Sequence, residues 1–222
     1  MATVLIIGAS RGIGLEFVRQ YRDAGQRVIA TARDDDAMAR LRELGAEALR
    51  VDVAEPASVS SLTWSLDGEA LDIALYVAGV IDRADARHPP TRDAFDRLMH
   101  TNVLGALQAI PQVLPGVESA NGVFGVLSST MSLIGQVPAS NAWLYRISKA
   151  ALNMAVASAR HDYPRARCIA LDPGWVQTDM GGRTAPVSVG DSVAGMRHVI
   201  ATLGPDDNGS LIHHDGRRAT SW

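Results

Sequence analysis

Residues 3–14 read TVLIIGASRGIG, an unbroken apolar run followed at once by a glycine-rich turn. The apolar run predicts a buried strand of a parallel sheet. Gly8 permits a tight turn, Gly12 lets a pyrophosphate approach the backbone, and Gly14 lets the next helix lie close to the strand. The spacing is G-x-x-x-G-x-G rather than G-x-G-x-x-G, so the strand-turn-helix context carries the prediction of a dinucleotide site. An ordinary turn between strand and helix is the alternative.

Further apolar runs alternate with helical patterns along the rest of the chain. Strands are predicted at 3–8, 27–32, 47–52, 71–78, 122–128, 167–172 and 210–215, and helices at 13–24, 35–44, 56–66, 92–110, 142–161 and 189–203. Stretches containing proline near 88–90, 111–115 and 186 are predicted to be loops. This order predicts an α/β fold, a single Rossmann-type doubly wound parallel sheet of about seven strands covered on both faces, over one domain at 1–222. The ligand should lie beyond the carboxyl ends of the strands.

Composition narrows the functional classes. A net charge of −3 gives no electrostatic reason to expect nucleic acid or an anionic membrane surface as a partner. No apolar span reaches the roughly 18 residues of a membrane helix, and the apolar N-terminus lacks the basic region of a signal peptide. The single cysteine, Cys168, cannot form an internal disulfide, which fits a reducing compartment and predicts a cytoplasmic location.

The end of the second predicted strand bears on cofactor selectivity. Arg33 ends the sequence TAR at 31–33, and Arg11 lies in the glycine loop. Two guanidinium groups near the adenosine ribose suit a 2′-phosphate, which favours NADP(H) over NAD(H). The acidic run 34–36 comes directly after and is interpreted as the start of the next helix. If the strand ended later, Asp34 could instead accept hydrogen bonds from the ribose of NAD.

The only lysine of the chain, Lys149, follows Tyr145 by four residues in a predicted helix, so the two share a face. A cation there is expected to lower the pKa of the phenol towards neutrality, and the ammonium could also donate to the ribose hydroxyls of a cofactor. At the end of the fifth strand, Ser128 and Ser129 could polarise a carbonyl group, or simply cap the next turn of the chain. Asn102 lies within a predicted helix, where packing is its alternative role.

Taken together, these motifs resemble those of the short-chain dehydrogenase/reductases, and the C-terminal third resembles the sniffer-type carbonyl reductases and bacterial C-factor-like members. The resemblance covers essentially the whole chain. It rests on the glycine loop at 8–14, Asp52-Val53, Ala78-Gly79, Asn102, a serine of the fifth strand, Tyr145-x-x-x-Lys149, Pro173-Gly174 and the sequence DPGWVQTDMGG at 172–182.

The resemblance implies a role for each matching residue. Tyr145 would exchange the proton with the substrate oxygen, Lys149 would hold the nicotinamide ribose, and Ser129 would orient the carbonyl. Asn102 would hold a water in a proton relay. The residues implied in cofactor binding are Gly8, Ser10, Arg11, Gly12, Ile13, Gly14, Arg33, Asp52, Val53, Ala78, Gly79, Tyr145, Lys149, Pro173, Gly174, Val176 and Thr178.

Three departures from the family pattern matter. Ile7 replaces the threonine before the first glycine, and 76–79 read YVAG where the family has Asn-Asn-Ala-Gly, so a side-chain brace between strands is missing. The gap from Ser129 to Tyr145 is 16 residues, whereas the family usually has 13. Counting back 13 residues from Tyr145 gives Ser132 as the catalytic serine. Ser129 is preferred because it ends the strand, and Ser132 stays open as the alternative.

The segment after Thr178 leads almost directly into the last helix, which suggests an open pocket walled by 133–144, Trp175 and 180–186. A metal site at His213-His214 is not expected, because neighbouring side chains on a strand point to opposite faces. The resemblance implies a carbonyl reductase or alcohol dehydrogenase acting on a small carbonyl or alcohol substrate, with a possible homo-oligomer. A cofactor-binding regulatory protein of C-factor type, with little turnover, is the alternative.

Overall fold

The computed structural model describes residues 1–220, and its centre is one parallel sheet of seven strands. The strands are β1 (Thr3–Ile7), β2 (Arg27–Ala32), β3 (Glu47–Arg50), β4 (Ile73–Tyr76), β5 (Val123–Leu127), β6 (Arg167–Asp172) and β7 (Leu211–His213), in the spatial order β3-β2-β1-β4-β5-β6-β7. Each neighbouring pair is parallel, and β1 pairs with both β2 and β4. The chain therefore reverses its direction of travel across the sheet at β1, which is the switch point where α/β sheets bind ligands.

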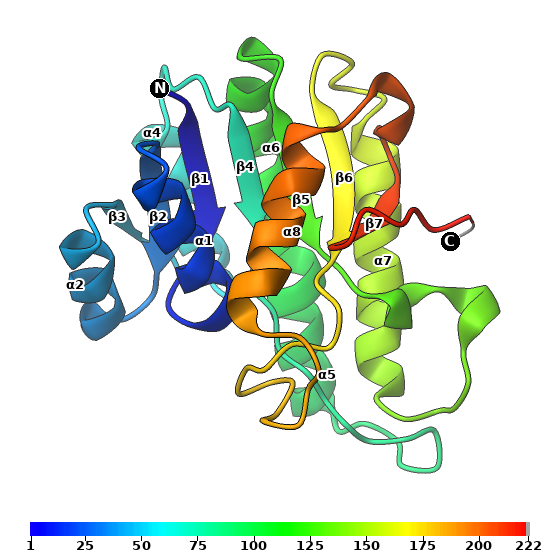
Figure 1. The fold of residues 1–222 in the computed structure, drawn as a ribbon. Helices are drawn as coiled ribbons and strands as arrows, with labels where there is room; N and C mark the ends of the chain where they lie inside the picture. The colour runs from blue at the N-terminus through cyan, green and yellow to red at the C-terminus, as the bar shows by residue number, and fades with distance from the viewer. Residues whose placement is uncertain (221–222) are drawn as a thin grey trace.

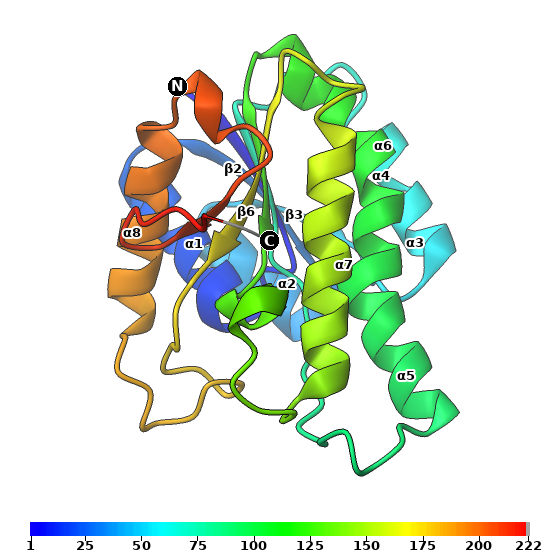
Figure 2. The ribbon, with the colours of Figure 1, turned by 90° about the vertical axis from the view of Figure 1, so that its right-hand side faces the viewer.

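Helices cover both faces of the sheet, as Figure 2 shows in a view along its edge. The helices are α1 (Gly12–Asp23), α2 (Asp35–Glu43), α3 (Pro56–Ser60), α4 (Leu62–Ser65), α5 (Arg92–Met99), α6 (Gly105–Ser119), α7 (Trp143–Ala159) and α8 (Val189–Ala201). One apolar core lies between the sheet and α1, α2 and α8, and a second lies between the sheet and α3, α4, α6 and α7. The predicted fold class is confirmed. None of the helices within residues 1–220 is long and apolar enough to cross a membrane.

The prediction of a loop at 111–115 is wrong, because both prolines lie inside α6. A proline within a helix costs about 3 kcal/mol, since it removes a backbone donor and crowds the preceding turn. Burial on one face outweighs this cost: Ile110, Val113 and Leu114 are each less than a tenth exposed, and each such side chain stabilises by about 1.5–3 kcal/mol. Tertiary packing thus overrides the local preference of the sequence.

All seven strands point the same way, so their carboxyl ends meet at one edge of the sheet, at the bottom of Figure 1. The connections that leave β1, β4, β5 and β6 gather at this edge. The long loop from 77 to 91 and the segment from 173 to 188 extend furthest from the sheet there. The candidate site lies among these connections.

Candidate active site

The glycine loop after β1 has the geometry that its sequence predicts. Gly8 has a φ of +91°, which residues with a side chain rarely adopt, and a Cβ there would lie 2.6 Å from the backbone nitrogen of Ala78. A Cβ at Gly14 would lie 2.2 Å from the carbonyl oxygen of Gly8. The first glycine therefore makes the turn and brings β1 close to β4, and the third lets α1 pack against the turn.

The start of α1 is suited to an anion. Gly12, its first residue, has a φ of +54°, and the first turn of the helix carries no acidic residue. Within the described residues, no side chain caps its N–H groups, since Arg11 stands at the N-cap position. Free N–H groups at a helix N-terminus, together with the helix dipole, attract phosphate. This cradle fits the diphosphate of a dinucleotide.

A cleft at the carboxyl edge of the sheet begins at this loop and crosses β1, β4 and β5. It also contains Met180 from the predicted pocket wall, and residues that the sequence did not single out, among them Thr101, Leu127 and Asp179. The predicted cofactor residues that line it are Gly8, Ser10, Arg11, Gly12, Ile13, Gly14, Arg33, Asp52, Val53, Ala78, Gly79 and Thr178.

The remaining predicted cofactor residues are not among the residues that line the cleft: Tyr145, Lys149, Pro173, Gly174 and Val176. The carbonyl of Pro173 accepts a hydrogen bond from the hydroxyl of Ser192 (2.7 Å), which ties the turn to α8. Gly174 has a φ of +78°, and Val176 is buried and pairs with Val187. These residues shape the chain after β6, which then presents Thr178 to the cleft.

The charged groups beside β2 favour the interpretation made from the sequence. The strand ends at Ala32, and the Asp34 carboxylate caps α2 by accepting a hydrogen bond from the Ala37 N–H at 2.9 Å. Arg33 lines the cleft, whereas Arg11 forms an ion pair with Asp179 across its mouth. The Asp34 carboxylate is therefore engaged in the helix cap, while Arg11 and Arg33 both line the cleft near the end of β2.

Tyr145 and Lys149 lie one turn apart on the buried face of α7. The Lys149 Nζ lies 5.6 Å from the centroid of the Tyr145 ring and donates a hydrogen bond to the Leu127 carbonyl at 2.6 Å. It also lies 3.5 Å from where a Cβ on Gly79 would stand. Leu127 and Gly79 both line the cleft, so the ammonium lies next to its lining, although Lys149 itself is not one of the lining residues.

Burial dominates the titration of both groups. It lowers the pKa of the Lys149 ammonium to about 8. Burial raises the pKa of the Tyr145 phenol to about 12, with a further increase from Asp172 and an opposing effect of a hydrogen bond with Ser129. The pKa of the phenol is therefore raised in this arrangement and not lowered as expected, because the loss of solvation is its largest cause. The ammonium is directed to Leu127 instead of to the phenol oxygen.

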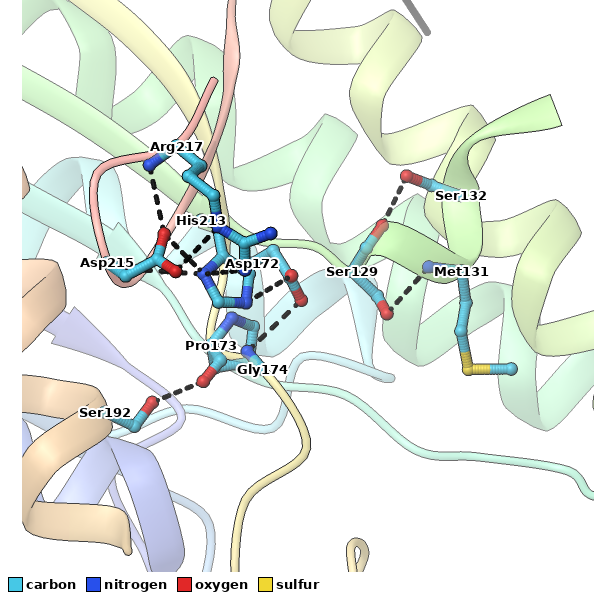
Figure 3. Close-up of polar contacts among 10 residues, drawn as sticks. All are labelled: Ser129, Met131, Ser132, Asp172, Pro173, Gly174, Ser192, His213, Asp215 and Arg217. Atoms are coloured by element: carbon cyan, nitrogen blue, oxygen red, sulfur yellow. Dashed lines mark hydrogen bonds and ion pairs between the residues drawn. The ribbon is translucent and has the colours of Figure 1, made fainter. Parts of the chain in front are cut away.

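The two candidate serines have different surroundings. Ser129 caps a short 3₁₀ turn, where its hydroxyl accepts a hydrogen bond from the Met131 N–H at 3.1 Å, and its side chain is near enough to the Tyr145 phenol to lower the pKa of that group. The Ser132 hydroxyl is buried, donates to the Ser129 carbonyl and accepts from the Asn153 amide. Figure 3 shows Ser132 on the side of Ser129 away from Asp172. The structure thus brings Ser129 to Tyr145 and engages Ser132 in support of the loop.

Asn102 stands in a π-helical turn (His100–Leu104) between α5 and α6 and is fully buried. Its amide group accepts a hydrogen bond from the Val80 N–H at 2.8 Å and donates one to the Val80 carbonyl at 2.9 Å. It donates a third to the Ser148 hydroxyl at 3.0 Å. Both amide hydrogens are thus used to fix the chain after β4 against α7, so the side chain has little capacity left to hold a water.

A substitute exists for the brace that the family pattern provides after β4. Tyr76 is fully buried, and its hydroxyl donates a hydrogen bond to the Thr101 carbonyl at 2.7 Å. A Cβ on Gly105 would lie 2.6 Å from that hydroxyl, so glycine at 105 makes room for the ring. The tyrosine therefore ties β4 to the π-helical turn. Its large apolar ring gave no indication in the sequence that it would act through its hydroxyl.

The two histidines near the C-terminus do not separate as predicted. The strand β7 ends at His213, so the alternation of faces does not extend to His214, and the two ring centroids lie 4.3 Å apart. Across residues 1–220, no group of three or more histidine, cysteine, aspartate or glutamate side chains could hold a metal ion. Of the two tryptophans predicted near the substrate, Trp143 packs against the apolar cluster that contains Tyr145, and Trp175 is 58% exposed.

Comparison with known proteins agrees with this geometry. The family model of the short chain dehydrogenases matches residues 2–186. The chain is 33% identical to 1-hydroxy-2-glutathionyl-2-methyl-3-butene dehydrogenase of Rhodococcus sp. (strain AD45), over 97% of this chain and 98% of the relative. It is 39% identical to C-signal of Myxococcus xanthus, over 54% of this chain and 74% of the relative.

Among solved structures, the carbonyl reductase Sniffer of D. melanogaster superposes with a TM-score of 0.90 at 26% identity and full coverage of both chains. A carbonyl reductase from Pseudomonas aeruginosa PAO1 in complex with NADP superposes with a TM-score of 0.84 at 28% identity, also over all of both chains. The chain belongs to the short-chain dehydrogenase/reductase family of oxidoreductases, and the resemblance stated from its sequence is confirmed.

Proposed function

We propose that this protein is an NADP(H)-dependent carbonyl reductase that also oxidises the corresponding alcohol. The observation that carries the proposal is the placement of Tyr145 and Lys149: both are buried on one face of α7, and the lysine donates to the carbonyl of Leu127, which lines a cleft that begins at a phosphate cradle. Two relatives of similar length are carbonyl reductases, and one of them was solved in complex with NADP.

The residues around the cleft fit a dinucleotide that carries a 2′-phosphate. The start of α1 and the glycine loop would hold the diphosphate, while Arg11 and Arg33 would pair with the 2′-phosphate. Asp52 and Val53 would meet the adenine, and Thr178 would hold the carboxamide of the nicotinamide. Lys149 would donate to the nicotinamide ribose from beside Leu127.

When bound, NADPH supplies the hydride that reduces the carbonyl carbon. Ser129 then orients the carbonyl oxygen by a hydrogen bond, and Tyr145 donates its phenolic proton to that oxygen as the alcohol forms. The phenol of Tyr145 is protonated at neutral pH, as a proton donor must be. Oxidation of the alcohol uses the same groups in reverse, with Tyr145 as the base.

The surroundings of Tyr145 favour an apolar substrate. Tyr145 packs in a small apolar cluster with Leu98 and Leu144. Val80 and Ile81, from the loop after β4, are partly exposed and pack against the same cluster. Apolar walls with a few convergent polar groups are typical of small-molecule sites. Aldehydes, ketones and quinones with an apolar body are therefore the substrate class that we propose.

The test is NADPH oxidation with a panel of such carbonyl compounds, using wild type, Tyr145→Phe and a matched control, Tyr163→Phe, which removes the hydroxyl of a partly buried tyrosine beyond the end of α7. General acid catalysis is worth about 10²–10⁴-fold, so turnover of Tyr145→Phe should fall by that factor. The control should keep wild-type turnover. Unchanged turnover in Tyr145→Phe would contradict the proposal. Tight NADPH binding without turnover of any compound would favour the regulatory alternative.

A further inference from the structure

Three polar side chains are buried together beside the candidate site and have no role in the proposed mechanism. They are Ser128, Ser132 and Asn153, which are 2%, 3% and 3% exposed and form a polar cluster. Their chain neighbours Leu133 and Leu152 belong to the apolar core between the sheet and α7. Burying polar groups costs free energy that apolar side chains would not cost, so the bonds within the cluster are informative.

The amide group of Asn153 connects the two serines. The Ser128 hydroxyl donates to the Asn153 Oδ1 at 2.5 Å, and the Asn153 Nδ2 donates to the Ser132 hydroxyl at 2.7 Å. The Ser132 hydroxyl donates in turn to the Ser129 carbonyl, a bond drawn as a dashed line in Figure 3. Because that bond uses the only hydrogen of the Ser132 hydroxyl, this hydroxyl must accept from Asn153, which fixes the direction of every bond in the cluster.

These bonds hold the chain on both sides of Ser129. Ser128 comes directly before it and continues the pairing with β6, since its N–H donates to the Leu171 carbonyl at 2.7 Å. Ser132 follows it by three residues, at the end of the 3₁₀ turn (Thr130–Ser132), and its N–H also donates to the Ser129 carbonyl, at 3.0 Å. The short segment that carries the Ser129 side chain is therefore attached to Asn153 at each end.

Asn153 lies on the same face of α7 as the two groups already placed in the mechanism. It follows Lys149 by four residues and Tyr145 by eight, and all three are buried residues of this helix. One helix thus carries the proton donor, the lysine and the amide that holds the serine segment. Because the helix sets the spacing of these three groups, attachment to Asn153 also sets the place of the serine segment relative to Tyr145.

We propose that Asn153 is a positioning residue: it holds both sides of Ser129 against α7, so that the serine hydroxyl keeps a fixed place relative to Tyr145 when it orients the substrate carbonyl. This inference rests on the proposed function, in which Ser129 makes that hydrogen bond. The cluster suits the role, because a fully satisfied set of buried hydrogen bonds rigidifies its surroundings and specifies one arrangement. Its bonds use the carbonyl of Ser129 and leave the hydroxyl to the substrate.

The principal test is Asn153→Ala, which leaves both serine hydroxyls of the cluster without their partner on α7. We expect kcat for carbonyl reduction with NADPH to fall by about 10–100-fold, because a small displacement of a group that orients the substrate can cost this much. The affinity for NADPH, measured by fluorescence titration, should stay at the wild-type value. None of the three side chains of the cluster lines the cleft that would hold the cofactor.

A second variant, Ser132→Ala, breaks only the connection from Asn153 to the Ser129 carbonyl. It removes a single oxygen atom, so it tests the inference even if Asn153→Ala does not fold, and kcat should again fall. Asn208→Ala is the matched control. The Asn208 amide accepts from the Cys168 N–H at 2.9 Å, near the amino end of β6 and therefore at the opposite edge of the sheet from the site. This control should lower the melting temperature and keep the wild-type kcat.

Combining each variant with Ser129→Ala separates positioning from general loss of structure. If the cluster acts through Ser129, a protein without the Ser129 hydroxyl has no group left to position. Asn153→Ala and Ser132→Ala should then cause no further loss of kcat in that background. A general loss of structure would lower kcat by the same factor in both backgrounds.

The outcomes also separate this inference from the proposed function. A loss of kcat that occurs with Ser129 present, and is absent from the Ser129→Ala background and from Asn208→Ala, supports the inference. Equal losses in the two backgrounds, or wild-type kcat in both Asn153→Ala and Ser132→Ala, would overturn it. If Tyr145→Phe is fully active, the proposed function fails; if Tyr145→Phe is inactive and the cluster variants keep the wild-type kcat, only this inference fails.

Discussion

The two ends of the candidate site differ in what forms them: backbone groups at the glycine loop, and buried side chains at Tyr145 and Lys149. At the glycine loop, the backbone determines the shape of the site. Gly8, Gly12 and Gly14 set the turn, and free N–H groups at the start of α1 face the cleft. At the other end, side chains determine the properties of the site. Tyr145 and Lys149 are both buried, and burial raises the pKa of the tyrosine and lowers the pKa of the lysine. The first end depends on shape and the second on electrostatics. The difference predicts that substitutions at the two ends will fail in different ways.

The largest effect is expected at the backbone end, from Gly8→Ala. The new Cβ would meet backbone atoms of Ala78 at 2.6 Å, and the residue would have to keep a φ of +91°. Left-handed strain alone costs about 1–3 kcal/mol, and backbone cannot move aside cheaply, so the free energy of unfolding should fall by more than about 3 kcal/mol. Urea denaturation measures it.

The matched control for that change is Gly25→Ala. Gly25 also has a left-handed φ, +73°, but a Cβ there would meet nothing within 4 Å. It should cost only the conformational strain, about 1 kcal/mol. Equal losses in the two variants would contradict the account of close contact between β1 and β4 at the glycine loop.

The next largest effect is expected on cofactor affinity, from the arginines at the mouth of the cleft. Arg33→Ala should weaken NADPH binding by about 10–100-fold, since a charged hydrogen bond is worth about 1.5–3 kcal/mol, and should leave NADH binding nearly unchanged. Fluorescence titration with both nucleotides measures this. Arg42→Ala, an exposed arginine on the same stretch of chain in α2, is the control. Tighter binding of NADH than of NADPH by the wild type would refute the roles of Arg11 and Arg33.

A smaller effect is expected from Tyr76→Phe. The substitution keeps the buried ring but leaves the Thr101 carbonyl without its donor at 2.7 Å. An orphaned buried acceptor costs about 1–3 kcal/mol, and thermal unfolding should show a loss in this range. A melting temperature equal to that of the wild type would mean that the hydroxyl does not brace β4.

The sequence predicted the backbone end better than the electrostatic end, for physical reasons. Glycine positions and apolar runs encode strands, turns and close packing locally, and these predictions match the structure. The loop assigned to Pro111 and Pro115 was wrong because long-range burial holds α6 together. The engagement of Ser132 with Asn153 and the brace from Tyr76 also depend on residues far apart in the chain. Spacing alone could not supply them.

The pKa shifts of Tyr145 and Lys149 could not be predicted from the sequence for the same reason. A lysine one turn from a tyrosine indicates proximity, but the sequence does not give the solvation of either group. Nor does it show that Lys149 bonds Leu127, or that Asp172 arrives from β6 on the α7 side. The pKa of the phenol is set by these long-range contacts, and burial determines its direction.

The most direct test of the account is the carbonyl reductase activity of Lys149→Arg. The lysine sits 3% exposed, with its ammonium 2.6 Å from the Leu127 carbonyl and close to Gly79, so a planar guanidinium has neither the room nor the geometry to replace it. We predict that NADPH-dependent reduction falls by about 100-fold or more, in line with the loss of a positioned catalytic group, while the fold is retained by circular dichroism. Wild-type turnover in this variant would contradict the account.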